Sequence, residues 1–247
     1  MNDVVVRKCT TLPEFEACVT LQREIWGEED LEIEPVTGFL VASETGGQVL
    51  GAYDGDRLVG YTLGVVGYRD GVIFIHSHHT GVHHDYRDRG VGRKLKLFQR
   101  DEALSRDIRF VQWTFDPLEL RNAHFNLNRL GGISRQYKPN LYGITSSPLH
   151  RGLATDRLMV EWHLDSKRVV AAIGNLLTEP SPVEIGARIE LPVELEQWKQ
   201  ADVVATRKVQ DRIRVEFMNN FNRGYATVGT RKTSTGTEYL LVPWSDF

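Results

Sequence analysis

The sequence predicts a mixed α/β (α+β) protein whose central sheet is mainly antiparallel and flanked by helices. Short β-branched or alternating segments are interleaved with amphipathic segments, in the order βα(α)βββαβαβ. A long strand-like segment, residues 72–82, runs into a glycine-containing loop, and a helical pattern follows the loop at once. With 247 residues, of which 41% are hydrophobic, the chain is long enough to bury a full core.

Cap and turn signals divide the first half of the chain. Thr11 followed by Pro13 is typical of a helix start, and Asp54-Gly55-Asp56 is a tight-turn signal between two strand-like runs. These signals predict strands at 4–6, 49–53, 58–66 and 72–82, and helices at 11–26, at 35–43 and after Gly92.

The second half continues the alternation of strands and helices up to about residue 165, and a different order of elements follows. Asp116-Pro117 ends a strand, Gly131-Gly132 stops a helix, and Gly224 stops a long amphipathic helix whose apolar residues are mostly three or four apart. We therefore expect an α/β domain at 1–165 and a C-terminal strand-helix-hairpin extension at 166–247. The expected elements are strands at 108–115, 134–142 and 188–191, helices at 118–130 and 193–223, and a hairpin of 225–228 with 238–242.

Composition excludes several classes of protein. The 30 basic and 33 acidic side chains nearly cancel, so we expect neither a nucleic-acid nor a membrane partner. Two cysteines are too few for a disulfide framework. The start has no signal-peptide pattern, and about 18 consecutive apolar residues occur nowhere. We expect a cytoplasmic location.

The segment after residue 82 carries the strongest functional signal. Glycines at 90 and 92 allow backbone N–H groups to converge, and the helix that follows adds the positive end of its dipole. Such a loop binds phosphate groups. The spacing fits neither the dinucleotide-binding fingerprint, because Leu95 stands where a third glycine is needed, nor the Gly-Lys-Ser/Thr loop of nucleotide triphosphatases.

The run Val82-His83-His84-Asp85-Tyr86-Arg87-Asp88-Arg89-Gly90-Val91-Gly92 resembles the acetyl-CoA signature of the GNAT superfamily, Arg/Gln-x-x-Gly-x-Gly/Ala. The resemblance implies the GNAT fold and a coenzyme A pyrophosphate bound by this loop. The segment Asn122-Ala123-His124-Phe125 is similar to the family's second block, whose Asn contacts the pantetheine arm. The cofactor-binding residues implied are Thr80, Gly81, Val82, Arg87, Asp88, Arg89, Gly90, Val91, Gly92, Arg93, Asn122 and Phe125.

Five of the eight histidines lie between His76 and His84. On a strand His76 and His78 share one face, and we expect His79 on the other. Histidine can accept a proton from an amine near pH 7, so His76 and His78 are candidates for the general base. The pair also resembles the His-x-His of serotonin N-acetyltransferase. Two alternatives stay open: a wet, polar sheet face, or ligands of iron or zinc.

The general acid is less clear from the sequence. Many GNAT enzymes have a tyrosine four residues before the glycine that ends the fourth helix, and this chain has Leu127 there. Tyr142 or Tyr137 are substitutes, with Tyr142 preferred. Because guanidinium groups bind carboxylates, we expect arginines to contact an acidic acceptor. The candidates for acceptor contacts are Arg121, Asn126, Arg151 and Arg157.

Together these features predict an acyl-CoA-dependent N-acyltransferase that moves an acetyl or succinyl group to the amine of a small molecule. The whole chain resembles a GNAT subgroup of which some members accompany N-acylamino acid racemases, which implies an amino acid as acceptor. No metal is required, and a homodimer stays open. The alternatives are a non-catalytic acyl-CoA-binding protein and a metal-dependent enzyme that uses the histidine strand.

Overall fold

The computed structural model describes residues 3–27, 33–143, 152–181 and 183–244. The chain divides into two compact units, Met1–Gln112 and Trp113–Phe247. The division falls inside strand β5 (Phe110–Phe115) and therefore differs from the expected domains, 1–165 and 166–247, which stay a prediction. No helix in the described part of the chain is long and apolar enough to cross a membrane.

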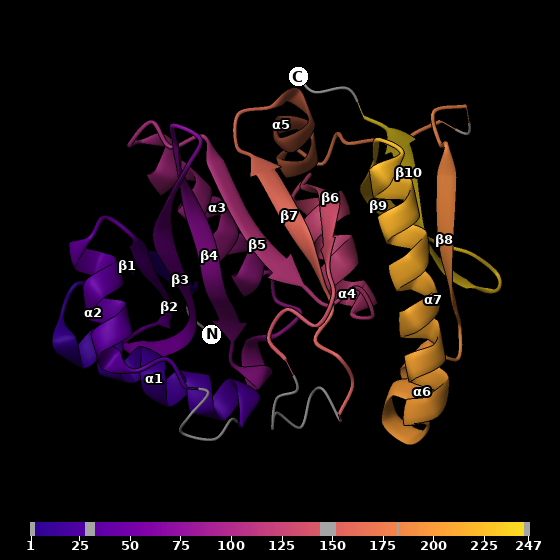
Figure 1. The fold of residues 1–247 in the computed structure, drawn as a ribbon. Coiled ribbons are helices and arrows are strands. Elements are labelled where there is room, and N and C mark those ends of the chain that lie inside the picture. The colour runs from indigo at the N-terminus through magenta and orange to yellow at the C-terminus, as the bar shows by residue number, and fades with distance from the viewer. Residues whose placement is uncertain (1–2, 28–32, 144–151, 182, 245–247) are drawn as a thin grey trace. The chain divides into compact units, whose positions relative to one another are not determined.

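Unit 1 is a sheet with helices on both faces (Figure 1). Its strands lie in the order β1-β2-β3-β4-β5; the first three pairs are antiparallel, and β4 with β5 is parallel. Adjacent residues of β2 point to opposite faces, so Val49 packs with α1 and α2 while Leu50 packs with α3. The elements of unit 1 are β1 (Val5–Lys8), α1 (Leu12–Trp26), α2 (Val36–Glu44), β2 (Gln48–Asp54), β3 (Arg57–Arg69), β4 (Val72–Val82), a 3-10 turn (His84–Tyr86) and α3 (Val91–Leu104).

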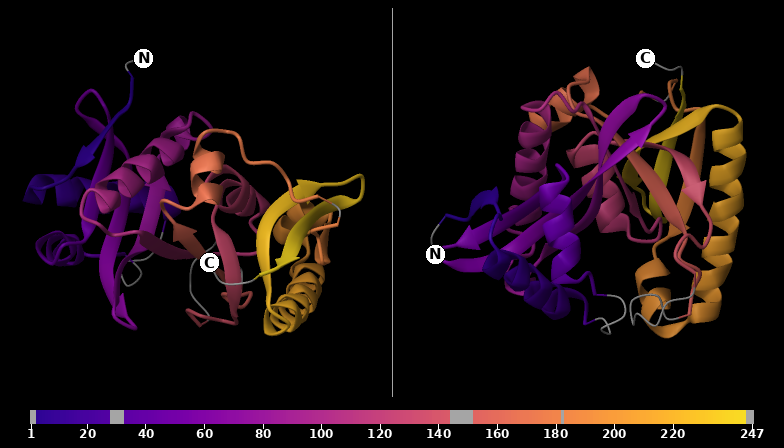
Figure 2. Two further views of the ribbon diagram at one scale, coloured as in Figure 1. Left: turned by 90° about the horizontal axis from the view of Figure 1, so that it is seen from above. Right: turned by 60° about the vertical axis from the view of Figure 1, so that its left-hand side comes forward.

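Unit 2 holds a second antiparallel set of strands in the order β7-β6-β9-β10-β8. Figure 2 shows α7 running along one face of these strands. There Phe217 stacks on Tyr137 and meets Tyr239 edge-on, with ring centroids 5.6 and 5.1 Å away. The elements of unit 2 are α4 (Leu120–His124), a π-helical turn (Phe125–Arg129), β6 (Ile133–Lys138), β7 (Arg157–His163), α5 (Lys167–Ile173), β8 (Ala187–Pro192), α6 (Leu195–Ala201), α7 (Val203–Asn222), β9 (Tyr225–Lys232) and β10 (Gly236–Pro243).

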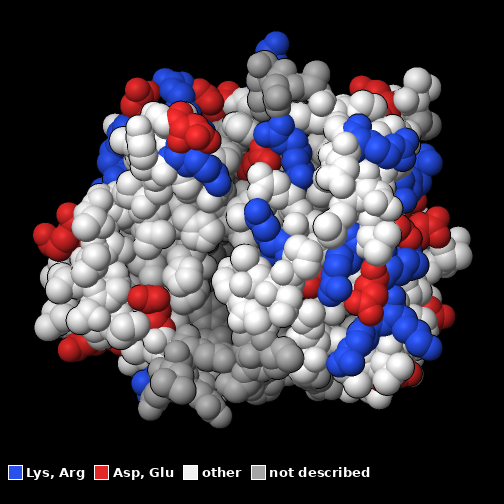
Figure 3. All heavy atoms as spheres, in the orientation of Figure 1, with Lys and Arg blue, Asp and Glu red and all other residues white. Residues whose placement is uncertain are grey.

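The face of unit 2 over α7 is rich in Lys and Arg (Figure 3). Two arginines of α7 are paired with acids: Arg212 with Glu216 at 2.8 Å, and Arg214 with the fully buried Asp156 at 2.8 Å. Pairing makes this a surface of mixed charge, as the near balance of the composition suggests.

The predicted fold class, a mixed and mainly antiparallel sheet flanked by helices, is confirmed. Two details of the prediction are wrong. The long helix expected at 193–223 is two helices, because the Asp202 side chain accepts hydrogen bonds from the N–H groups of Val204 and Ala205 and so begins a new helix. The strand expected at 134–142 ends at Lys138, and Tyr142 lies in the turn region that follows.

Candidate active site

The glycine loop forms an open helix start. Asp88 and Gly90 have positive φ angles of 61° and 77°, and Gly90 is the N-cap of α3. No side chain caps this helix, and its first turn has no acidic residue. The first N–H groups of an α-helix have no partner within the helix, so those of Val91 and Gly92 can donate to an anion. The loop therefore has the geometry that a pyrophosphate needs.

Basic residues around the loop are held in different ways. Arg87 donates from Nε to the carbonyl of Val82 at 3.3 Å, and the guanidinium of Arg89 lies 5.4 Å from the centre of the Tyr86 ring. Lys94 instead binds Asp3 and the carbonyl of Val4, so its charge is directed to the N-terminal segment.

The end of β4 is tied to β3. Thr80 shares a hydrogen bond of 3.2 Å with Thr62 of β3, and Gly81 pairs with Tyr61. The parallel register between β4 and β5 joins two pairs, Ile75 with Val111 and His76 with Gln112. Within unit 1, the residues of β4 after His79 are thus hydrogen-bonded to β3.

A β-bulge changes the side on which one histidine lies. Gly64 of β3 pairs with Ser77 and Leu63 pairs with His79, so His78 is an extra residue in β4. The rings of His76 and His78 are 6.3 Å apart, and His78 stacks on His79 at 4.0 Å. The three rings share one face, so the expectation that His79 points to the other face is wrong. Ser77 does point the other way, where its hydroxyl accepts from Lys96 of α3 at 2.7 Å.

The three imidazoles differ in burial. Burial, reinforced by the neighbouring His78, lowers the pKa of His76 to about 4 and that of His79 to about 3. Both rings are therefore neutral at pH 7. The side chain of His78 is 36% exposed, and its Nε2 lies 3.5 Å from Oε2 of Glu34. Of the three, His78 is the ring that an acceptor can reach.

In unit 2, the predicted acid Tyr142 is half exposed and lies among polar groups. Its hydroxyl is 3.0 Å from Oγ1 of Thr114, and the guanidinium of Arg157 lies 5.3 Å from the centre of its ring. The alternative, Tyr137, donates to the buried carboxylate of Asp156 at 2.7 Å, and burial together with this bond raises the pKa of Tyr137. Tyr142 is therefore the more exposed of the two tyrosines.

The sequence model of the acetyltransferase (GNAT) family matches residues 14–131. Residues 14–131 are a GNAT acetyltransferase domain. The predicted class of enzyme, an N-acyltransferase, is confirmed at the level of this family. No curated protein matches the sequence.

Solved structures share the fold of this GNAT domain. The ribosomal-protein-S18-alanine N-acetyltransferase of Escherichia coli is 12% identical, with a TM-score of 0.52, and the match covers 66% of this chain and 95% of that one. An aminoglycoside 6'-acetyltransferase type Ii is 18% identical, with a TM-score of 0.51 and shares of 66% and 99%. A GNAT family acetyltransferase from Elizabethkingia anophelis, solved with acetyl-CoA bound, is 11% identical, with a TM-score of 0.50 and shares of 66% and 99%.

The predicted site residues in α4 and the π-helical turn differ in how exposed they are. Arg121 and Asn122 are exposed on α4, Phe125 is half-buried, and Asn126 is buried. Asn128 is structural, because it pairs with the backbone N–H and C=O of Thr230 at 2.9 and 3.1 Å. Leu127, four residues before Gly131, is fully buried. Arg151 lies outside the described residues.

Two carboxyl groups, one in each unit, were missed by the sequence analysis. Asp116, at the end of β5, accepts from the N–H of Leu118 at 2.8 Å, and burial raises its pKa to about 6. Glu34 precedes α2 and faces His78. Nothing in the local sequence distinguishes either from a surface acid, since their neighbours come from distant parts of the chain.

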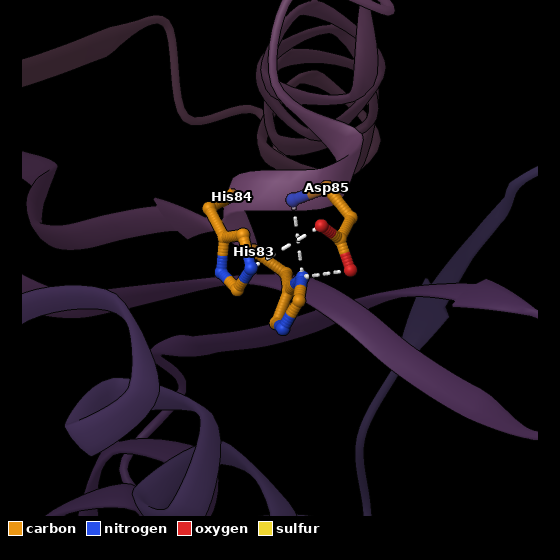
Figure 4. Close-up of side chains that lie close together, drawn as sticks. All are labelled: His83, His84 and Asp85. Carbon is orange, nitrogen blue, oxygen red and sulfur yellow. Dashed lines mark hydrogen bonds and ion pairs between the residues drawn. The ribbon is translucent and has the colours of Figure 1, made fainter.

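Among the described residues, one group has the ligand spacing of a metal site: His83, His84 and Asp85, with ligand atoms within 4.8 Å of one another (Figure 4). His83 is buried, with 6% of the residue exposed. Its Nδ1 accepts from the N–H of Asp85 at 3.2 Å, and its Nε2 lies 3.3 Å from the Arg57 guanidinium. The same Nε2 lies 3.6 Å from Oε2 of Glu24, so both ring nitrogens of His83 already have protein neighbours.

Proposed function

We propose that the protein is an acyl-CoA-dependent N-acyltransferase that transfers an acetyl or succinyl group to the amine of a small molecule, with an amino acid as the acceptor of choice. The observation that carries this proposal is the uncapped, acid-free start of α3 directly after β4. Such a start binds a pyrophosphate, and the family to which the domain belongs acts on acyl groups. Acetyl-CoA bound to the Elizabethkingia relative supports the same co-substrate here.

In the proposed reaction His78 takes a proton from the acceptor ammonium. The free amine attacks the thioester carbonyl, the C–N bond forms and the C–S bond breaks. The amine nitrogen releases its second proton as the amide forms, and coenzyme A leaves as a thiolate. The thiolate takes up a proton from Tyr142 or from water, and the proton released by the nitrogen replaces the one that is given up. General-base catalysis contributes on the order of 10²–10⁴ in rate. His76, with its pKa of about 4, is neutral at pH 7 and keeps the neighbourhood of His78 free of a second positive charge.

Residues carried over from the resemblance complete the proposal. The loop from Arg87 to Arg93 holds the pyrophosphate, Thr80 to Val82 line the thioester end, and Asn122 and Phe125 contact the pantetheine arm. The proposed acceptor contacts are Arg121, Asn126 and Arg157.

The test is isothermal titration of the purified protein with acetyl-CoA and succinyl-CoA. Gly90→Glu places a carboxylate at the start of α3, where an anion is meant to bind, and should weaken binding by at least about tenfold. Gly71→Glu is a matched control: Gly71 has a φ of 82° beside the 77° of Gly90, neither has a neighbour within 4 Å of an added Cβ, and Gly71 lies at the opposite end of β4. Equal losses in both variants, or no binding by the wild type, would refute the proposed site.

The buried Leu127 favours one alternative, an acyl-CoA-binding protein without turnover. Thiol release from acetyl-CoA, measured with a panel of amino acids and simple amines, separates the two. Release that depends on the amine and is lost in His78→Ala supports an enzyme. Tight binding with no amine-dependent release supports the alternative.

A further inference from the structure

The backbone of Glu34 is clamped by α1. Gln22, which is fully buried, donates from Nε2 to the carbonyl of Glu34 and accepts from its N–H at Oε1, both at 3.2 Å. A side-chain amide that pairs with both backbone groups of one residue fixes that residue in the same way as a strand neighbour. The starting point of the Glu34 side chain is therefore set by α1.

The path of the Glu34 side chain is set by a missing methyl group on α2. A Cβ added to Gly38, the third residue of the helix, would lie 1.6 Å from Oε1 of Glu34 and 2.7 Å from its Cδ. The carboxylate thus occupies the space that any other residue at position 38 would fill. No side chain caps α2, and its first turn has no acid, so the positive end of the helix dipole favours a carboxylate here.

The same carboxylate faces His78. Its Oε2 lies 3.5 Å from Nε2 of the ring. Among the described residues, two further ionisable side chains have a printed contact with this ring, His76 and His79 of the same strand, and both are neutral at pH 7. Lys96 and Arg69 act on His76. Glu34 is therefore the anion that lies against His78 when the ring gains a proton.

We infer that Glu34 is the positioning residue of the base, and that Gly38 gives it the room to act. The inference rests on the proposed function, because it needs His78 to accept the proton. With its Nε2–H directed to the carboxylate, the neutral imidazole has its lone pair on Nδ1. The ammonium proton moves to Nδ1, and the imidazolium that forms is stabilised by Glu34 until the proton passes to solvent or to the thiolate.

Gly38→Ala and Glu34→Gln test this from two sides. Alanine is favoured over glycine inside a helix, and the displaced atoms are the end of a flexible side chain, so Gly38→Ala should keep or raise the melting temperature. Both variants should nevertheless lower kcat about tenfold with the best amine of the panel, at unchanged affinity for acetyl-CoA. Gly38→Ala in the Glu34→Gln background should cause no further loss. Glu44→Gln, an exposed acid at the other end of α2, is the matched control and should leave kcat unchanged.

Nitrogen NMR of the imidazole rings at pH 8 shows which ring nitrogen carries the proton, and the measurement needs no acceptor amine. We expect His78 to carry its proton on Nε2 in the wild type and in Glu44→Gln, and a mixture of tautomers in Glu34→Gln and Gly38→Ala. An unchanged tautomer in those two variants, or an unchanged kcat while His78→Ala is inactive, overturns the inference alone. Full activity of His78→Ala overturns the base in the proposed function instead.

Discussion

Lys96 of α3 is the most deeply buried ammonium group of unit 1, and replacing it should change how stability depends on pH. Its side chain donates to Oγ of Ser77 at 2.7 Å and to Oε1 of Gln99 at 3.0 Å, and only 3% of the residue is exposed. Burial lowers its pKa from 10.5 to about 7. The substitution Lys96→Met keeps most of the packed aliphatic chain and removes the ionisable group.

The magnitude follows from proton linkage. Between pH 7 and pH 10.5 the unfolded chain holds the Lys96 proton and the folded protein has released it. The unfolded state therefore binds more protons, and the free energy of unfolding rises with pH. Each pKa unit corresponds to 1.36 kcal/mol, so between pH 7 and pH 9 the wild type should gain about 2 kcal/mol that Lys96→Met lacks. Below pH 7 both states are protonated and this dependence fades.

Urea unfolding followed by tryptophan fluorescence at pH 6, 7, 8 and 9 measures this difference. The quantity to compare is the free energy of unfolding of the wild type minus that of Lys96→Met. Lys94→Met, which removes a partly exposed ammonium two residues earlier, is the matched control. A difference between wild type and Lys96→Met that is the same at pH 7 and pH 9 would refute the reasoning.

Three further predictions concern unit 2. Leu127→Tyr should overfill a fully buried site and lower the free energy of unfolding by about 1–3 kcal/mol, without faster thiol release; a urea titration beside the thiol assay checks both, and a stable, faster variant would contradict it. Arg214→Ala leaves the buried Asp156 carboxylate without its guanidinium and should cost about 3 kcal/mol in urea unfolding, whereas Arg212→Ala, on the surface of the same helix, should cost much less. Tyr142→Phe should slow thiol release and leave acetyl-CoA binding by titration calorimetry unchanged; an unchanged rate would remove Tyr142 as the acid.

Much of the fold of unit 1 could be predicted because its signals are local. The strand at 72–82 is found at Val72–Val82, since β-branched residues and the glycine loop mark both of its ends. The hairpin around Asp54-Gly55-Asp56 follows from a turn signal of the same kind. The glycine loop and the start of α3 were predictable for this reason too, because the glycines and the helix that follows are contiguous in the chain.

The features that escaped prediction depend on partners far away in the sequence. A period-of-two count along β4 assumes unbroken pairing. The bulge at His78 instead places His79 on the same face as His76 and His78. The apolar spacing around Asp202 fits one long helix, and only the capping geometry divides it. Glu34 is recognisable only when the clamp from Gln22 and the contact with His78 are known.

The π-helical turn Phe125–Arg129 affects how this chain is aligned with its relatives. The N–H of Leu130 bonds to the carbonyl of Phe125, five residues back rather than four. The turn therefore takes one more residue than α-helical geometry needs, and each following side chain is rotated by about 100° from its α-helical direction. A tyrosine position found by counting four residues back from Gly131 assumes α-helical turns throughout. Superposition of side-chain directions, rather than sequence counting, is the sound way to decide which residue of this segment corresponds to that tyrosine.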